Sequence, residues 1–235
     1  PCHFDEALIG IGEQEAYKPD YIIYIGDTLV SKRAKHFLQH CHPKSCVVVN
    51  ASGELTDVTM NVTDVVVCPV EDALDSLCEK LESGDVALGN EASAFRGRWA
   101  MALDEWAIRC KVFEPAYSQM MAVRRLCEQT NGQECHMQFA NSSAVRLGQL
   151  YSSHHLYVNR GVNGIEGSLS TAVGFASEKA VTVYCVIGDL SFFYDQNALW
   201  NGVGKRHLRM VVLNNGGGGI FHQLRGLEQS PYRDS

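Results

Sequence analysis

Several features are missing from this sequence, and each absence narrows the class of protein. No apolar run is long enough to cross a membrane, and the opening segment, PCHFDEALIG, does not have the pattern of a signal peptide. Basic residues are not in excess, because the formal net charge is −7, so nothing points to nucleic acid as a partner. Internal repeats and low-complexity segments are also absent. These absences indicate a globular protein with no sign of a nucleic-acid partner or a membrane span.

The cysteines lack the patterns of a disulfide framework or a zinc site. There are nine of them, an odd number, and no pair has the CxxC spacing. Several occur within apolar runs, as Cys46 and Cys185 do. The cluster His40-Cys41-His42 with Cys46 matches no standard zinc spacing. The sequence therefore predicts reduced thiols and a cytoplasmic location.

What is present is an alternation of apolar strands with helical patterns. With 46% hydrophobic residues, the chain can bury a sizeable core. The alternation predicts an α/β fold with doubly wound parallel sheets. The expected strands span residues 21–25, 46–49, 65–68, 137–140, 156–158, 181–187 and 210–213. The expected helices span residues 31–41, 70–81, 91–111, 115–128 and 168–176, with a further helix capped by Asn141 or Ser142.

The chain has a predicted division into three parts. Residues 1–88 form a partial Rossmann-like unit, in which residues 1–18 are irregular or an entry helix. A break at Ser83-Gly84-Asp85 precedes a long, mostly polar helical pattern, so residues 89–114 are expected to be a connecting helix. Residues 115–235 form a second unit of regular strand and helix alternation.

Polar residues follow two strands of the second unit. Gly188, Asp189 and Leu190 come after residues 181–187, and Asn214 and Asn215 come after residues 210–213. Parallel strands joined by a helix end on the same edge of a sheet, so these residues are expected to meet where open α/β sheets bind ligands. The alternative is two ordinary strand-end turns, which also favour Asp, Asn and Gly.

The residue types at this edge favour a metal-bridged diphosphate. Asp189 offers a carboxylate oxygen and Asn215 an amide oxygen, and the glycine run 216–219 adds backbone carbonyls such as that of Gly217. These hard oxygen ligands suit Mg²⁺ or Ca²⁺ and not zinc. Glycines also let the main chain approach a phosphate closely and expose N–H groups to it.

Motifs in this region resemble a known family. The sequences GDL at 188–190 and NN at 214–215 resemble the thiamine-diphosphate motif, usually GDG followed by NN. The flanking segments narrow the resemblance to the 2-succinyl-5-enolpyruvyl-6-hydroxy-3-cyclohexene-1-carboxylate synthase family of menaquinone biosynthesis. These segments are SFFYDQNALW, NNGGGGIF, NRGVNGIEGSLSTAVG at 159–174 and, more weakly, TLVSKR at 28–33.

The resemblance implies a domain identity for each part. Residues 1–88 would be part of the middle domain, and residues 115–235 would be the thiamine-diphosphate domain without its carboxyl-terminal end. The domain that carries the family's activating glutamate has no counterpart here, so no catalytic side chain is assigned. The chain is therefore expected to be a fragment that is inactive alone and binds cofactor weakly, from an enzyme that is a homodimer or homotetramer.

The resemblance also implies the reaction. The family decarboxylates 2-oxoglutarate and adds the succinyl carbanion equivalent to isochorismate in a 1,4-addition, with thiamine diphosphate and Mg²⁺ or Mn²⁺ as cofactors. Two alternatives stay open: another thiamine-diphosphate-dependent 2-oxo acid decarboxylase or carboligase, and a non-catalytic diphosphate-binding module.

Site residues follow from the matched motifs. The metal ligands would be Asp189, Asn215 and Gly217. Ile165 would be the aliphatic residue that bends the cofactor, and Ile220 and Phe221 would form the apolar wall near its thiazolium ring. The other cofactor-binding residues would be Gly188, Leu190, Ser191, Asn215, Gly217 and Gly219.

By the resemblance, the carboxylates of the substrates would be held by the polar and cationic side chains of Lys32, Ser142, Arg146 and Arg160, and Leu224 would be a further substrate-binding residue. Arginine suits this role because its guanidinium forms bidentate contacts with a carboxylate. Without the family, each arginine is equally explained as a solvated surface charge, and Ile165 as ordinary core. The sequence departs from the family at Arg225, where proline is expected, and His207 and His222 have no assigned role. The predicted substrate-binding residues are Lys32, Ser142, Arg146, Arg160 and Leu224.

Overall fold

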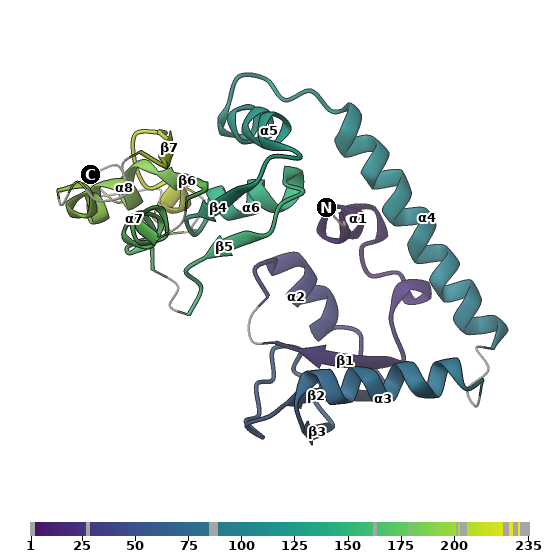
Figure 1. Ribbon diagram of the computed structural model, residues 1–235. Coiled ribbons are helices and arrows are strands. Elements are labelled where there is room, and N and C mark those ends of the chain that lie inside the picture. The colour runs from purple at the N-terminus through teal and green to yellow at the C-terminus, as the bar shows by residue number, and fades with distance from the viewer. Residues whose placement is uncertain are drawn as a thin grey trace. The chain divides into compact units, whose positions relative to one another are not determined.

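The computed structural model describes residues 3–26, 29–84, 89–161, 164–178, 180–200, 202, 206–222, 226–227 and 230. It divides into two compact units, Cys2–Phe113 and Glu114–Ser235. Each unit has a parallel sheet with helices, which confirms the predicted α/β class (Figure 1). Within the described ranges, no helix is long and apolar enough to cross a membrane.

The first unit contains a three-stranded parallel sheet. Its strands β1 (Tyr21–Ile25), β2 (Ser45–Asn50) and β3 (Asp64–Val67) lie in the order β1-β2-β3. Helix α2 (Lys32–Gln39) joins the first two strands, and α3 (Val70–Glu82) follows the third. Ser31 caps α2 as predicted, because its Oγ accepts a hydrogen bond from the backbone N–H of Ala34 at 2.9 Å. The predicted order of strands and helices in this unit is confirmed.

Aromatic side chains join three further helical elements of the first unit. These are α1 (Phe4–Ile11), the 3₁₀ turn η1 (Glu15–Tyr17) and the long helix α4 (Asn90–Val112). The Trp99 ring of α4 stacks on Phe4 with centroids 4.9 Å apart, and its Nε1 donates to the Tyr17 carbonyl at 3.1 Å. Helix α4 has no buried residue, yet this contact packs it within the first unit. The region that we expected to be a linker therefore contributes to a core.

The core of the first unit lies on one face of its sheet. Ile22 and Tyr24 of β1 are buried, whereas Tyr21, Ile23 and Ile25 are exposed. Because side chains alternate along a strand, the exposed residues all lie on the opposite face. The core residues are Ala7, Leu8, Ile11, Ile22, Ala34, Phe37, Cys41 and Cys46.

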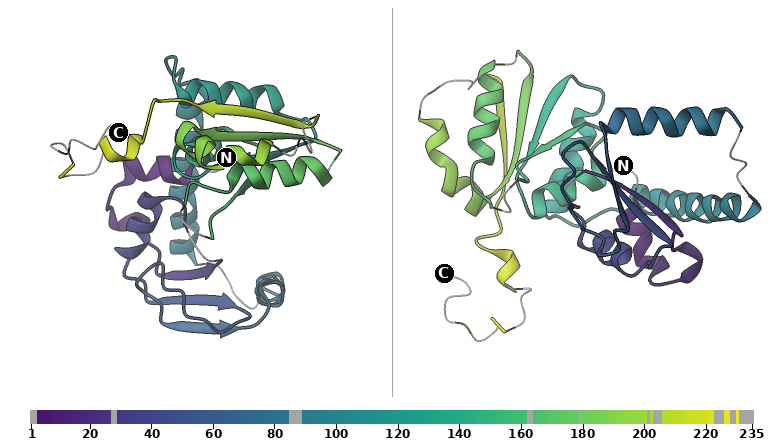
Figure 2. Two further views of the ribbon diagram at one scale, coloured as in Figure 1. Left: turned by 90° about the vertical axis from the view of Figure 1, so that its left-hand side faces the viewer. Right: turned by 90° about the horizontal axis from the view of Figure 1, so that it is seen from below.

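The second unit contains a four-stranded parallel sheet in the order β5-β4-β6-β7. Figure 2 shows helices on both sides of it, as a doubly wound fold requires. The helices are α5 (Gln119–Thr130), α6 (Ser143–Tyr151), α7 (Ser168–Glu178) and α8 (Asp189–Asp195), with 3₁₀ turns η2 (Gln196–Leu199) and η3 (Gly219–His222). The strands are β4 (Cys135–Phe139), β5 (Leu156–Val158), β6 (Thr182–Gly188) and β7 (Leu208–Leu213).

Side-chain size and spacing explain how this sheet is covered. Helix α7 buries an apolar stripe at helical spacing, Leu169, Ala172, Val173 and Ala176. On α6, Gly148 lies directly against the Phe139 ring of β4, because an added Cβ would come within 2.7 Å of it. The close approach of α6 to the sheet therefore depends on that glycine.

One predicted helix start in the second unit is wrong, and one predicted cap lacks its side-chain hydrogen bond. The helix expected from residue 115 begins at Gln119, because Ser118 supplies the cap through a hydrogen bond from the Met121 N–H at 3.3 Å. At α6, Ser142 precedes the first helical residue but its side chain forms no capping bond. Its backbone instead has φ 71°, a conformation that is uncommon for residues other than glycine.

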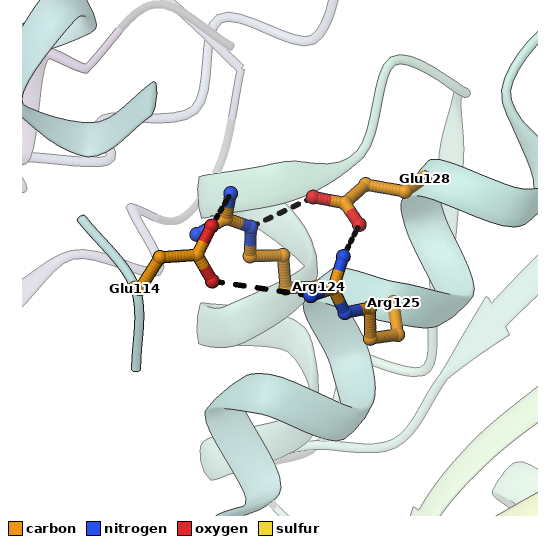
Figure 3. Close-up of polar contacts among 4 residues, drawn as sticks. All are labelled: Glu114, Arg124, Arg125 and Glu128. Carbon is orange, nitrogen blue, oxygen red and sulfur yellow. Dashed lines mark hydrogen bonds and ion pairs between the residues drawn. The ribbon is translucent and has the colours of Figure 1, made fainter. Parts of the chain in front are cut away.

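A charged cluster holds the start of the second unit (Figure 3). Arg124 Nη2 lies 3.0 Å from Glu114 Oε1, and Arg124 Nε lies 2.7 Å from Glu128 Oε1. Arg125 completes the cluster, with Nη1 2.8 Å from Glu128 Oε2. The hydrogen bonds from Arg124 and Arg125 lower the pKa of Glu128 below its ordinary value of 4.5. The cluster therefore attaches the segment before α5 to the helix itself.

We expect Glu128→Gln to destabilise the protein slightly near neutral pH. A carboxylate with a lowered pKa contributes stability above its ordinary pKa, and this contribution is lost as the pH falls through the lowered value. The pairs are partly exposed, so the loss should be about 0.2–1 kcal/mol. Urea unfolding at pH 7 and pH 3 measures it, with Glu105→Gln on α4 as an exposed single-pair control. An equal loss at both pH values would contradict the assignment.

Candidate functional site

The strand order of the second unit defines a point where ligands bind in folds of this type. From β4 the chain passes to β5 on one side, and then returns across to β6 on the other side of β4. The connections after β4 and β6 therefore leave the sheet in opposite directions. Ligands of doubly wound folds bind outside the carboxyl ends of the strands at such a point.

A pocket of about 230 Å³ lies at this position. Its walls come from the ends of β4, β6 and β7, from the loop before α7, and from the starts of α5 and α8. Eleven residues predicted for the site line it, although their roles stay predictions. They are Ser142, Ile165, Gly188, Asp189, Leu190, Ser191, Asn215, Gly217, Gly219, Ile220 and Phe221.

Asp189 is the buried charged residue of this pocket, with 7% of its surface exposed. Its Oδ2 accepts hydrogen bonds from the backbone N–H groups of Gly216, at 2.8 Å, and Gly217, at 3.1 Å. Its Oδ1 accepts from the N–H of Leu190 at 2.8 Å. The predicted convergence of Asp189 and Asn215, which follow β6 and β7, is confirmed, because both residues line this pocket. Here the N–H groups of the glycine run face the carboxylate, whereas the carbonyl of Gly217 accepts from Gly219 N–H at 3.1 Å.

Glycine occupies the positions at the pocket for different reasons. Gly216 and Gly217 have φ of 76° and 155°, so their backbone conformation requires glycine. Gly218 lies under the Phe221 ring, which an added Cβ would approach to 2.5 Å. Gly188 has an ordinary φ of −73°, and an added Cβ would have no atom of the described residues within 4 Å. Neither backbone conformation nor packing explains glycine at 188, whereas close approach of a ligand would.

Ile165 is held on the pocket by a hydrogen bond to α8. Ser191 Oγ donates to the Ile165 carbonyl, and both residues line the pocket. Ser191 is buried and Ile165 is half-buried. The loop between β5 and α7 is thereby attached to the helix that begins with Asp189.

Arg160 lies beside the pocket and not in its lining. Its Nη1 donates to Asn141 Oδ1 at 3.2 Å, and Asn141 does line the pocket. The Nε of Arg160 is buried and has no hydrogen-bond partner within the described residues. A buried N–H of a charged group without a partner is costly, so this arginine suits an anionic ligand.

None of the remaining predicted residues is among the described residues that line the pocket. Arg146 is exposed on α6, one turn after Ser142, and is not part of the pocket lining. Lys32 is the first residue of α2 in the other unit, where it is exposed. Leu224 and Arg225 lie outside the described residues. The proposed substrate contacts of these side chains stay predictions.

Six lining residues were given no individual role by reasoning from the sequence, although one of them, Gly218, belongs to the predicted glycine run 216–219. Asn141 follows β4 just as Asp189 follows β6, so the strand-end rule could have identified it. Gln119 had no such signal, because its Nε2 reaches the Leu213 carbonyl at 3.5 Å only through the packing of α5 beside β7. The six are Gln119, Asn141, Ser143, Ala144, Leu213 and Gly218.

The donors at the pocket are oxygens with a single carboxylate. Across the described ranges, no group of three or more His, Cys, Asp or Glu side chains could hold a metal ion. A metal at Asp189 would therefore also need neutral oxygens, such as the Asn215 side chain and backbone carbonyls, and oxygens of a ligand. This pattern fits Mg²⁺, which is commonly shared between a carboxylate and substrate phosphates.

Comparison with known proteins agrees with this geometry. Residues 140–234 match the model of the thiamine pyrophosphate enzyme C-terminal TPP binding domain. That range contains the whole pocket lining except Gln119. This stretch of the chain is therefore similar to the thiamine pyrophosphate enzyme family.

The similarity to particular members of this family extends over almost the whole chain. It is 39% identical over 233 residues to the 2-succinyl-5-enolpyruvyl-6-hydroxy-3-cyclohexene-1-carboxylate synthase of Bacteroides fragilis, which covers 97% of this chain. The synthase of Bacteroides thetaiotaomicron is 39% identical over 236 residues, and that of Christiangramia forsetii is 44% identical over 122 residues, 50% of this chain and 21% of its own length. The chain spans 40% of the length of the two Bacteroides relatives. The predicted resemblance to these synthases is confirmed.

Proposed function

We propose that the pocket binds thiamine diphosphate together with a divalent metal ion. The observation that carries the proposal is the convergence of Asp189, the glycine run and Ile165 on one pocket, within the segment that matches a thiamine pyrophosphate binding domain. The unexplained glycine at 188 adds support, because it leaves room for a ligand against the backbone. The first unit, in this proposal, is part of the family's middle domain.

Each part of the pocket has a proposed role toward the cofactor. Asp189, the Asn215 side chain and the Gly217 carbonyl would hold Mg²⁺ or Mn²⁺, which in turn would bind the diphosphate. Ile165 would support the bend of the cofactor, and Ile220 and Phe221 would contact its apolar ring. The backbone of the glycine run and the residues Gly188, Leu190, Ser191 and Gly219 would surround the diphosphate end.

The whole protein would act as its relatives are named, as a 2-succinyl-5-enolpyruvyl-6-hydroxy-3-cyclohexene-1-carboxylate synthase. When bound, the cofactor supplies an electron sink for decarboxylation of a 2-oxo acid. The protein's part is to place 2-oxoglutarate and isochorismate and to neutralise their carboxylates. Arg160 is the best supported of the proposed carboxylate-binding residues because its Nε lacks a protein partner among the described residues.

We further infer a cytoplasmic enzyme that forms homodimers or homotetramers. The eight described cysteines are all free, and burial raises the pKa of the Cys185 thiol to about 12, which makes it unreactive. Free thiols favour a reducing compartment. Sedimentation of the purified protein measures the oligomeric state.

Substrate selectivity tests the proposed function. The experiments that need turnover use a full-length synthase, by which we mean a protein of the relatives' length that contains residues 1–235. With thiamine diphosphate and Mg²⁺ present, CO₂ release is expected from 2-oxoglutarate and not from pyruvate, and isochorismate should be consumed in parallel. If the enzyme prefers pyruvate, the proposed function is wrong, and the protein is another carboligase of the family.

The 235-residue chain by itself should not turn over 2-oxoglutarate. Ile220 and Phe221, the proposed apolar wall, are 49% and 44% exposed, so a cofactor bound here would remain in contact with water, which weakens binding and electrostatic stabilisation. CO₂ release by the purified chain, compared with a control without cofactor, measures this. Turnover above the control would show that the chain alone completes the site.

A further inference from the structure

The side chain of Asn141 joins the end of β4 to three points of the β5–α7 segment. Its Nδ2 donates to the carbonyl of Asn159 at 2.8 Å and to the carbonyl of Gly164. Its Oδ1 accepts from Arg160 Nη1 at 3.2 Å. Asn141 is 9% exposed, and both the donor and the acceptor end of its amide are used.

These partners determine which way the amide faces. Two carbonyl oxygens can only accept hydrogen bonds, so the NH₂ group must point to Asn159 and Gly164. The amide oxygen is then directed at Arg160. Because that oxygen is neutral, it orients the guanidinium without cancelling its charge, and none of the ion pairs among the described residues includes Arg160.

The same side chain also acts on the residue next to Gly164. Asn141 holds the Gly164 carbonyl on one side of Ile165, and Ser191 Oγ holds the Ile165 carbonyl on the other. The short segment is thus attached both to β4 and to α8. Asn141 and Ile165 both line the pocket.

We propose that Asn141 is a positioning residue that orients the uncompensated charge of Arg160 toward an anionic ligand and places Ile165 on the pocket. The proposal rests on the proposed function, in which that ligand is the carboxylate of a 2-oxo dicarboxylic acid. Asn141 acts through Arg160 and Ile165, so its effect must depend on them.

The first test examines Arg160 directly and needs no ligand. The measurement is an NMR spectrum of the ¹⁵N-labelled 235-residue chain. The signal of the Arg160 Nε–H is identified as the one that disappears in Arg160→Lys. The buried Nε–H should exchange slowly with water, and Asn141→Ala should shift the signal and speed its exchange at least about tenfold, since one hydrogen bond is worth about 1.4 kcal/mol. Gln138→Ala removes another buried amide of β4 that does not contact Arg160 and should leave the signal in place.

The second test measures coupling in the full-length synthase. Asn141→Ala and Arg160→Ala should each lower kcat/KM for 2-oxoglutarate roughly tenfold or more. The double variant should lose less than the sum of the two effects, because only the part that Asn141 exerts through Ile165 remains once Arg160 is gone. Asn141→Asp keeps the size of the side chain but pairs Arg160 with a carboxylate. It should remove the preference for 2-oxoglutarate over 2-oxopentanoate, which lacks the second carboxylate.

The outcomes separate the two proposals. An Nε–H signal unchanged in Asn141→Ala, or additive effects in the double variant, would overturn the positioning role. If the wild-type synthase does not use 2-oxoglutarate, the proposed function fails, and the Nε–H signal still decides the role of Asn141. Where Asn141→Ala does not fold, the substrate preference of Asn141→Asp decides instead, and an unchanged preference for 2-oxoglutarate over 2-oxopentanoate would overturn the positioning role.

Discussion

Replacing Asp189 by alanine is expected to abolish metal-dependent binding of thiamine diphosphate to the full-length synthase. Asp189 is the one carboxylate that lines the pocket in the described residues, and a divalent cation there would lose its charged ligand. Removing a residue that only supports a metal ligand already lowers the metal affinity about 10–100-fold. Removing the ligand itself should therefore lower it at least about 100-fold. Calorimetry with thiamine diphosphate, in the presence and absence of Mg²⁺, measures the change.

A conservative variant separates metal binding from folding. Asp189 also accepts hydrogen bonds from Gly216 and Gly217, so Asp189→Ala leaves buried N–H groups without partners. Asp189→Asn retains one acceptor oxygen for these groups but lacks the charge for the metal. Compared with Asp189→Ala, we expect Asp189→Asn to regain much of the thermal stability but none of the Mg²⁺-dependent affinity for the cofactor. Cofactor binding at the wild-type level in Asp189→Asn would refute the metal assignment.

Replacing Arg160 by alanine is expected to lower kcat/KM for 2-oxoglutarate by one to two orders of magnitude. A hydrogen bond to a charged group is worth about 1.5–3 kcal/mol, and the buried Nε of Arg160 has no partner among the described residues to compensate for it. Thermal stability should change little, since the one hydrogen bond found for the side chain goes to Asn141. Steady-state kinetics of the full-length synthase measure the effect.

Two variants distinguish binding from structure at this position. Arg160→Lys keeps the charge but loses the bidentate geometry of the guanidinium, so it should recover only part of the activity. Arg206→Ala removes an exposed arginine before β7 that is absent from the pocket lining and is the matched control for a lost surface charge. If Arg160→Ala instead melts at a much lower temperature with nearly normal kinetics, Arg160 is structural.

Local patterns in the sequence were sufficient for the fold class and for half of the site. The apolar run at 181–187 and the shorter one at 210–213 identified β6 and β7, and a helix between parallel strands puts their carboxyl ends on one edge. The convergence of Asp189 and Asn215 on one pocket followed from that rule. Helix starts were less predictable. Pro115 is a favourable first residue of a helix, yet the helix begins at Gln119, because the Ser118 side chain accepts a hydrogen bond from the N–H of Met121.

Strand neighbours that are not consecutive in the chain could not be predicted. The pairing of β4 with β6 passes over β5 in sequence, and it is this pairing that places Asn141 beside the pocket. Gln119 reaches the same pocket through the packing of α5. The peptide orientation in the glycine run was also unpredictable, because φ at Gly216 and Gly217 is free to take either sign.

The sequence by itself determined which residues are apolar at strand or helix spacing, which glycines and carboxylates follow the strands, and which family the motifs resemble. Those properties are local, since the spacing of apolar residues indicates only which face of a helix or strand is buried. The tertiary structure alone decided that Arg160 donates a hydrogen bond to Asn141, that Ile165 is held by Ser191, and that Arg146 is not in the pocket lining. Such contacts depend on which buried faces pack together, and that choice is made by the summed burial of many distant residues.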